Sequence, residues 1–263
     1  TSLIESGDFS GKASEACVLR NLNTPFKRII LVGTDGASNP QKMIKAIEAG
    51  ASELFKTPAV NAVWAIEGLA EDHDWQATIV ARSTLTAAYQ YSGTGKKPKP
   101  KKLETVTYWC ASENDSNIAN QGLNYGGAIG NGMNTARQLG NLPANICTPN
   151  YLAEQASQLA EEQANLTTSI LNESEMKKLK MGSLLSVSTG SVEPGNLIVM
   201  NYTGADSSLK PIVLVGKAVT FDTGGISLKP GRGMDEMKFD MCGGASVFGV
   251  MNALLETKLP VNV

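Results

Sequence analysis

The first half of the chain alternates short apolar runs rich in β-branched residues with longer segments that carry apolar residues at helical spacing. Short runs of this kind are typical of strands, and apolar residues three or four positions apart are typical of helices. The pattern predicts strands at 26–33, 60–66 and 105–110, with helices at 41–55 and 75–91 between them. Strands and helices that alternate in this way favour an α/β fold.

The second half continues the mixture of helices and strands. A polar stretch at 111–117 offers several helix caps, and a long helix is predicted from about Ile118 to Leu139. We place the domain junction here, with an N-terminal α/β domain at 1–115, expected to lack its start, and a second domain at 116–263. Thr148 and Pro149 open a further helix that should end near Ala164. The remaining predictions are helices at 173–179 and 243–256 and strands at 166–171, 197–202 and 212–215.

Several glycines lie inside the predicted long helix, at positions 122, 126, 127, 130 and 132. Glycine-rich segments cradle phosphates when a strand directly precedes them and a Lys-Ser/Thr pair follows. Neither feature is present here. We therefore interpret these glycines as points where another element packs closely against the helix.

Overall charge argues against a nucleic-acid partner. The net charge is −2 and the pI about 5.6, so the chain as a whole does not attract polyanions. One segment, Gly95–Lys102, contains five lysines and two prolines. It is either a basic patch for nucleic acid or a solvated loop. Prolines prevent regular structure and no aromatic residues are interleaved for base stacking, so we interpret it as a loop.

Histidine and cysteine usage excludes several catalytic classes. The only histidine, His73, lies in an acidic stretch and is interpreted as a surface residue, which excludes Ser-His-Asp, Cys-His and HExxH chemistry. The cysteines are widely spaced and are expected to be reduced, mostly buried thiols of a cytosolic protein; they are Cys17, Cys110, Cys147 and Cys242. No apolar run approaches the ~20 residues that span a bilayer, and the first residues lack a signal-peptide pattern. We expect a cytoplasmic protein with no membrane partner.

Chemistry-bearing residues concentrate at Lys217, Asp222, Lys229 and Asp240, around a Gly-Gly pair and directly after the apolar run 212–215. The end of a strand is where open α/β sheets place ligands. A partly buried cluster of lysines and aspartates is either an ion-pair network or a metal site. Aspartate oxygens suit Mg²⁺, Mn²⁺ or Zn²⁺, and a nearby dication can make a neutral lysine ligand feasible. From the residues alone, both interpretations stay open.

The spacing Lys-x4-Asp-x6-Lys-x10-Asp and its surrounding residues resemble the signature of the leucyl aminopeptidase family of metallopeptidases, also called cytosol aminopeptidases. The resemblance extends upstream through Ala136–Cys147 and covers about 120–263 well, whereas the first hundred residues match in general layout. It implies an N-terminal α/β domain followed by a truncated three-layer αβα metallopeptidase domain with a mixed, mostly parallel sheet.

The resemblance also implies roles for individual residues. Lys217 corresponds to the amine ligand of a tightly held metal, Asp222 to a carboxylate that bridges two metals, and Asp240 to a ligand of the tight metal alone. Lys229 corresponds to a catalytic lysine that polarises the scissile carbonyl and stabilises the oxyanion. Met237 corresponds to a residue that lines the pocket for the first substrate side chain, although ordinary core packing would explain it equally well.

The implied activity is release of N-terminal, preferentially Leu-like, residues from peptides. The attacking hydroxide would be activated by two divalent metal ions, Zn²⁺ or Mn²⁺, in a cytosolic homohexamer. The family has a later Asn-Thr-Asp-Ala-Glu-Gly-Arg motif, whose Asp and Glu bind metal and whose Arg holds a bicarbonate. Nothing after Asp240 matches it, so the chain is expected to be a fragment that is inactive alone. The alternatives are a truncated, non-catalytic paralogue acting in binding or assembly, and DNA binding through Lys96–Lys102 as a secondary role.

Overall fold

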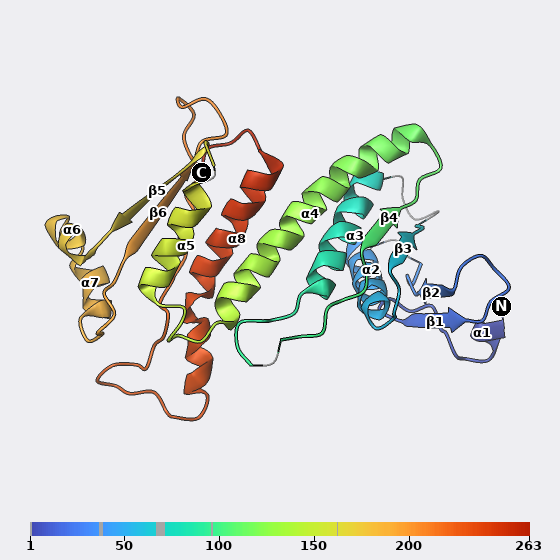
Figure 1. Cartoon of the computed structure of the whole chain (residues 1–263), viewed down its shortest axis with the longest axis horizontal. Coiled ribbons are helices and arrows are strands. Elements are labelled where there is room, and N and C mark those ends of the chain that lie inside the picture. Colours follow the sequence, from blue (N-terminus) through green and yellow to red (C-terminus); the bar gives the residue numbers. More distant parts are fainter. Residues whose placement is uncertain (1, 37–38, 67–71, 96, 162) are drawn as a thin grey trace. The chain divides into compact units, whose positions relative to one another are not determined.

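The computed structural model describes residues 2–36, 39–66, 72–95, 97–161 and 163–263, and the chain divides into two compact units. The first unit comprises Thr1–Gln90 and Lys97–Asn131, and the second Tyr91–Lys96 and Gly132–Val263. Helices and strands occur in both, which confirms the α/β class (Figure 1). The first unit contains α1 (Ser2–Glu5), β1 (Ala16–Arg20), β2 (Arg28–Val32), α2 (Pro40–Phe55), β3 (Asn61–Trp64), α3 (His73–Ala88), β4 (Thr105–Tyr108) and the first part of α4 (Glu113–Asn141). The second contains the end of α4, α5 (Pro149–Glu161), β5 (Leu166–Leu171), α6 (Glu173–Lys178), α7 (Gly182–Ser188), β6 (Leu197–Tyr202), the 3₁₀ helix η1 (Met234–Met241) and α8 (Cys242–Thr257).

Two strand pairs and two packed helices build the first unit. β1 pairs antiparallel with β2, and β3 pairs parallel with β4 so that Trp64 lies opposite Tyr108. α2 begins where the Asn39 side chain accepts a hydrogen bond from the N–H of Gln41, and Pro40 occupies the first turn, where no N–H is needed. The core consists of buried apolar side chains of α2, α3, β4 and α4: Met43, Ile47, Ala77, Ile79, Val80, Tyr108 and Ala119.

The glycines of α4 permit close packing, as predicted. A Cβ added to Gly122 would lie 2.1 Å from the carbonyl oxygen of Asp74, and one added to Gly126 would lie 2.1 Å from that of Thr78. Both contacts join α4 to the backbone of α3. Gly127 is the exception, because a Cβ there would meet no atom within 4 Å. The prediction of helix packing rather than a phosphate cradle is confirmed for the other glycines.

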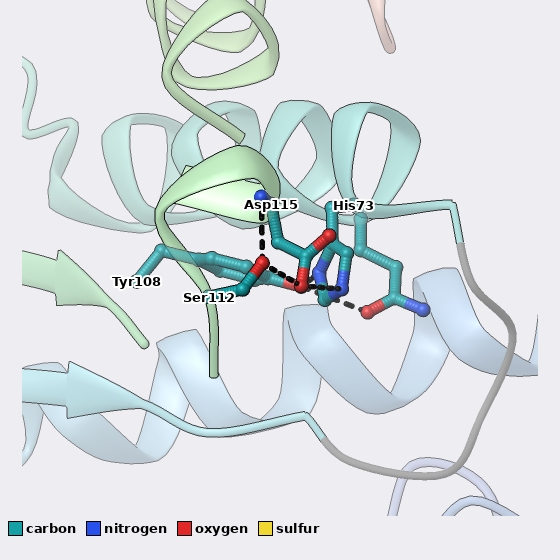
Figure 2. A network of polar contacts seen from close by, with 5 residues as sticks. His73, Tyr108, Ser112 and Asp115 are labelled. Carbon is teal, nitrogen blue, oxygen red and sulfur yellow. Dashed lines mark hydrogen bonds and ion pairs between the residues drawn. The ribbon is translucent and has the colours of Figure 1, made fainter. Parts of the chain in front are cut away.

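His73 is not the surface residue that was predicted. Its side chain is 23% exposed, with Nδ1 3.3 Å from the Tyr108 hydroxyl and Nε2 3.9 Å from Oδ2 of Asp115 (Figure 2). Tyr108 donates to Oε1 of Gln76 at 2.9 Å, and burial raises the pKa of Tyr108 to about 12, so the phenol keeps its proton. The Ser112 hydroxyl accepts from the N–H of Asp115, and this cap starts α4 earlier than Ile118. The histidine thus helps join α3, β4 and α4.

One antiparallel strand pair and two long helices form most of the second unit. β5 and β6 pair from Leu166–Tyr202 to Leu171–Leu197, and Figure 1 shows α5 and α8 alongside them. Thr148 caps α5 as predicted, because its hydroxyl accepts from the N–H of Tyr151 at 3.2 Å. Two apolar clusters lie between these elements: Leu139, Leu142, Cys147, Leu152, Ala156, Met241, Ala245 and Phe248, and Leu166, Tyr202, Met251, Leu254 and Leu255.

The strand predicted at Ile212–Val215 is wrong. The N–H of Ile212 donates to the carbonyl of Asn262 at 2.8 Å, but the described residues place no strand ladder along the rest of the run. A strand is defined by its hydrogen-bonded neighbour, so β-branched composition alone does not make one. The side chains of this run are largely exposed to solvent, Val213 to 76% and Val215 to 92%. The strands predicted at 166–171 and 197–202 match β5 and β6 at both ends, and the other predicted helices and strands are present with shifted ends. The elements α1, β1, α7 and η1 were not predicted.

Three smaller predictions were also resolved. Residues 97–104 form neither helix nor strand, which confirms the loop, and Lys101 lies over the Phe55 ring at 5.1 Å; Lys96 lies outside the described residues. All four cysteines are free as expected, but only Cys147 is fully buried and Cys242 is exposed. No helix in the described ranges is long and apolar enough to cross a membrane.

Candidate functional site

All five predicted site residues lie between β6 and α8. Lys217, Asp222 and Lys229 belong to the long connection that follows β6, and Met237 and Asp240 belong to η1. η1 starts after Gly233, whose φ of 79° is accessible to glycine at little cost, and it ends at Met241, which is buried in the core of the second unit.

The backbone at Lys217 is held against the first turn of α8 by glycines. The N–H of Gly244 donates to the carbonyl of Lys217 at 2.6 Å. A Cβ on Gly243 would lie 2.8 Å from the Lys217 nitrogen, and one on Gly216 would lie 2.6 Å from the carbonyl oxygen of Gly243. Only glycine permits this close crossing. The sequence predicted a helix from residue 243 but not this close crossing, and in the structure no side chain caps the start of α8.

A tight turn brings Asp222 and Lys229 together. Oδ1 of Asp222 accepts the N–H of Gly224 at 2.8 Å, and the N–H of Lys229 donates to the carbonyl of Thr223 at 2.8 Å. Gly224 and Gly225 have φ values of 96° and 79°, a region that side chains with a Cβ rarely adopt. The Gly-Gly pair in the motif therefore makes the turn possible.

The four charged side chains form two ion pairs. Nζ of Lys229 lies 2.8 Å from Oδ2 of Asp222, and Nζ of Lys217 lies 2.9 Å from Oδ1 of Asp240. The hydrogen bond from Lys229, followed by that from the N–H of Gly224 and by the charges of Lys229 and Lys217, holds the pKa of Asp222 below its usual value. Lys217 therefore acts on both carboxylates, which shows that the four residues form one cluster.

One carboxylate oxygen in this cluster has no donor. Oδ2 of Asp240 is buried, and among the described residues no group donates a hydrogen bond to it. Leaving such an oxygen unpaired away from water is costly. Met237 precedes Asp240 by three residues in a 3₁₀ helix, in which side chains at that spacing lie on the same side, and it is half-buried.

The cluster combines the two interpretations left open by the sequence. It is an ion-pair network, and its oxygens also suit a hard divalent cation, for which the buried lone pairs on Asp240 are available. In the part of the chain that the structure describes, no three His, Cys, Asp or Glu side chains gather closely enough to hold a metal. The candidate ligands here are therefore two carboxylates and a lysine amine.

Comparisons with known proteins extend this picture to both units. The family model for the N-terminal domain of the cytosol aminopeptidase family matches residues 1–98, and the model for its catalytic domain matches residues 134–263. A probable cytosol aminopeptidase of Nitrosococcus oceani is 43% identical over 99% of this chain, and the cytosol aminopeptidase of Pseudomonas aeruginosa is 40% identical over all of it. Each alignment covers 54% of the relative, so the chain spans about half the length of these curated relatives.

Solved structures agree with the sequence comparison. A mutant of tomato leucine aminopeptidase is 28% identical with a TM-score of 0.81, over all of this chain and 51% of that one. The bottromycin maturation enzyme BotP in complex with Mn has a TM-score of 0.80 at 24% identity, over all of this chain and 55% of that one, a likeness that shows the fold alone. The comparisons of both units identify the same family as the lysine–aspartate motif does, and the chain belongs to the cytosol aminopeptidase family.

Proposed function

We propose that the natural protein is a metal-dependent aminopeptidase that releases N-terminal, preferentially Leu-like, residues from peptides. The observation that carries the proposal is the cluster of Lys217, Asp222, Lys229 and Asp240, in which a buried carboxylate oxygen is left without a donor. Membership of the cytosol aminopeptidase family supports the reaction class.

The proposed site binds two divalent metal ions, Zn²⁺ or Mn²⁺. Asp222, Asp240 and Lys217 would be their ligands in this chain. Asp240 has free lone pairs on Oδ2, and Asp222 is ionised because its neighbours lower its pKa. Lys217 would have to give up its proton and its ion pair with Asp240 to act as a ligand, a change that a bound dication favours because it repels the ammonium form. Bound divalent cations supply an activated water and polarise a peptide carbonyl.

Lys229 would act on the substrate rather than on the metal. Its ammonium is held by Asp222 at 2.8 Å, and the side chain is 34% exposed, so a peptide can reach it. A positive charge fixed at this point would polarise the scissile carbonyl and stabilise the oxyanion that forms from it. Met237, on the same side of η1 as Asp240, would contact the first side chain of the peptide.

The wider assignments belong to the same proposal. They are a cytoplasmic homohexamer that acts on peptides, with no membrane or nucleic-acid partner, and a domain junction near residues 115–116. The name cytosol aminopeptidase carried by the relatives supports the location and the peptide substrates, and family membership supports the homohexamer. The two family models match residues 1–98 and 134–263, and the proposed junction lies between these ranges.

Two substitutions in the natural full-length protein test the proposal. Lys229→Ala should cut kcat for Leu-p-nitroanilide by at least about a hundredfold while metal content stays normal, because it removes the oxyanion-stabilising charge and leaves the proposed metal ligands in place. Asp222→Ala should lose both metal and activity. Lys210→Ala, at an exposed lysine of the same connection, is the control and should change neither. Wild-type turnover in both site variants would refute the assigned roles, and a wild-type protein with neither metal nor hydrolysis would favour the non-catalytic paralogue.

A further inference from the structure

Lys238 lies between Met237 and Asp240 but takes no part in the ion pairs. Its Nζ instead donates to the backbone carbonyl of Asn141, the last residue of α4, at 3.2 Å. The same Nζ lies 4.9 Å from the centre of the Phe239 ring, and the side chain is half-buried. The lysine therefore connects η1 to an element about a hundred residues away in the sequence.

The end of α4 suits this contact. The last carbonyls of a helix lack partners within the helix and carry partial negative charge, so an ammonium there is favourable. The last turn of α4 also lies against the junction of η1 and α8: a Cβ on Gly140 would lie 3.1 Å from Sγ of Cys242 and 3.9 Å from Cδ1 of Phe239. η1 therefore packs at close range against the end of α4, and the Lys238 hydrogen bond joins the two elements at the same place.

Asp240 depends on this support because little else holds its carboxylate. Oδ1 forms an ion pair with the ammonium of Lys217, and Oδ2 has no donor among the described residues. If Lys217 became a neutral metal ligand, its ion pair with Asp240 would be lost. The direction of the Asp240 side chain would then be set by the backbone of η1.

We propose that Lys238 is a positioning residue for the metal centre: by binding the C-terminal carbonyl of α4, it fixes η1 so that the Asp240 carboxylate is pre-oriented for a divalent cation. This inference rests on the proposed role of Asp240 as a metal ligand. Groups that orient metal ligands without touching the metal typically contribute about 10–100-fold to affinity.

The test is the Mn²⁺ affinity of the metal-stripped natural full-length protein, measured by competition with a chromophoric chelator. Lys238→Met, which keeps much of the side-chain stem and removes the ammonium, should bind Mn²⁺ about 10–100-fold more weakly. Lys238→Arg should stay within about threefold of wild type, because a guanidinium can also donate to the carbonyl. Lys178→Met is the matched control, since it removes a lysine from the last turn of α6, and it should change nothing.

Melting temperatures of the metal-free variants separate positioning from general stability. Weaker Mn²⁺ binding with a nearly unchanged melting temperature, rescued by Lys238→Arg, supports positioning. Mn²⁺ affinity within about threefold of wild type in Lys238→Met, or a loss matched by instability that arginine does not repair, overturns it. If Lys238→Met does not fold, Lys238→Gln is measured against the same limits. Asp240→Asn completes the set: if it too keeps full affinity, the proposed metal centre is wrong, whereas if it alone loses metal, only the role of Lys238 is wrong.

Discussion

Neighbouring glycines of α4 should respond to the same substitution with opposite signs. At Gly126 an added methyl would lie 2.1 Å from the carbonyl oxygen of Thr78, far inside ordinary contact, and backbone of a packed helix cannot yield cheaply. At Gly127 the methyl would meet no atom within 4 Å. Both positions are interior to a helix, so both variants gain the helix preference of alanine over glycine, about 1 kcal/mol.

The expected difference follows from these two terms. Overpacking a core contact costs about 1–3 kcal/mol, and a 2.1 Å contact with backbone calls for the upper end, so Gly126→Ala should lower the free energy of unfolding by about 2 kcal/mol after the helix gain is subtracted. Gly127→Ala should raise it by about 0.5–1 kcal/mol. The gap between the variants is then about 2.5–3 kcal/mol.

Urea unfolding followed by tryptophan fluorescence measures this difference in unfolding free energy in the first unit, where the two glycines lie. All three tryptophans of the chain, Trp64, Trp75 and Trp109, belong to the first unit, which also contains the contact between α3 and α4. The midpoint should move in opposite directions at an unchanged m-value. Equal stabilisation by both variants would mean that α4 does not approach the α3 backbone at Gly126, and the reasoning from close packing would be refuted.

Further predictions concern thiols, pH and the lysine-rich loop. Burial, and to a smaller extent the nearby Cys242, raises the pKa of Cys147 to about 11. Ellman's reagent at pH 8 should therefore label the exposed Cys242 in the folded protein and reach Cys147 only after unfolding. Equal labelling rates for the two thiols would contradict this. The hydrogen bonds that Glu173 accepts from the N–H of Gly195 and the hydroxyl of Ser188 lower its pKa from 4.5. Its contribution is therefore complete above pH 4.5 and lost as the pH falls through the lower folded value, so the stability gap to Glu173→Gln should close on acidification; a gap independent of pH would be inconsistent with those bonds. Replacing the lysines of 97–102 by glutamine should leave retention of duplex DNA unchanged, and a salt-dependent decrease would support the DNA-binding alternative.

Sequence patterns predicted those parts of the fold in which a local signal and the tertiary contact agree. The cap at Thr148 and the apolar spacing of α8 are local, and both helices begin within a residue of their predicted starts. His73 shows the opposite case, because the partners that bury it, Tyr108 and Asp115, come from elements far along the chain. Val215 shows a third, in which composition indicates a strand but pairing depends on a neighbour that composition does not name.

The same distinction explains what was and was not predictable in the site. Motif spacing identified the charged residues, but it does not say which lysine pairs with which aspartate. The structure pairs Lys217 with Asp240, because the glycines of the first turn of α8, which directly follows η1, admit the Lys217 backbone beside them. Asp222 is held by its own turn and Asp240 by η1, so the carboxylates are fixed by backbone. Lys217 is the exposed member of its pair, at 61% against 15% for Asp240. In the proposed metal site, the Lys217 ammonium is therefore the member of the pair that solvent can reach, and the Asp240 carboxylate is the covered one.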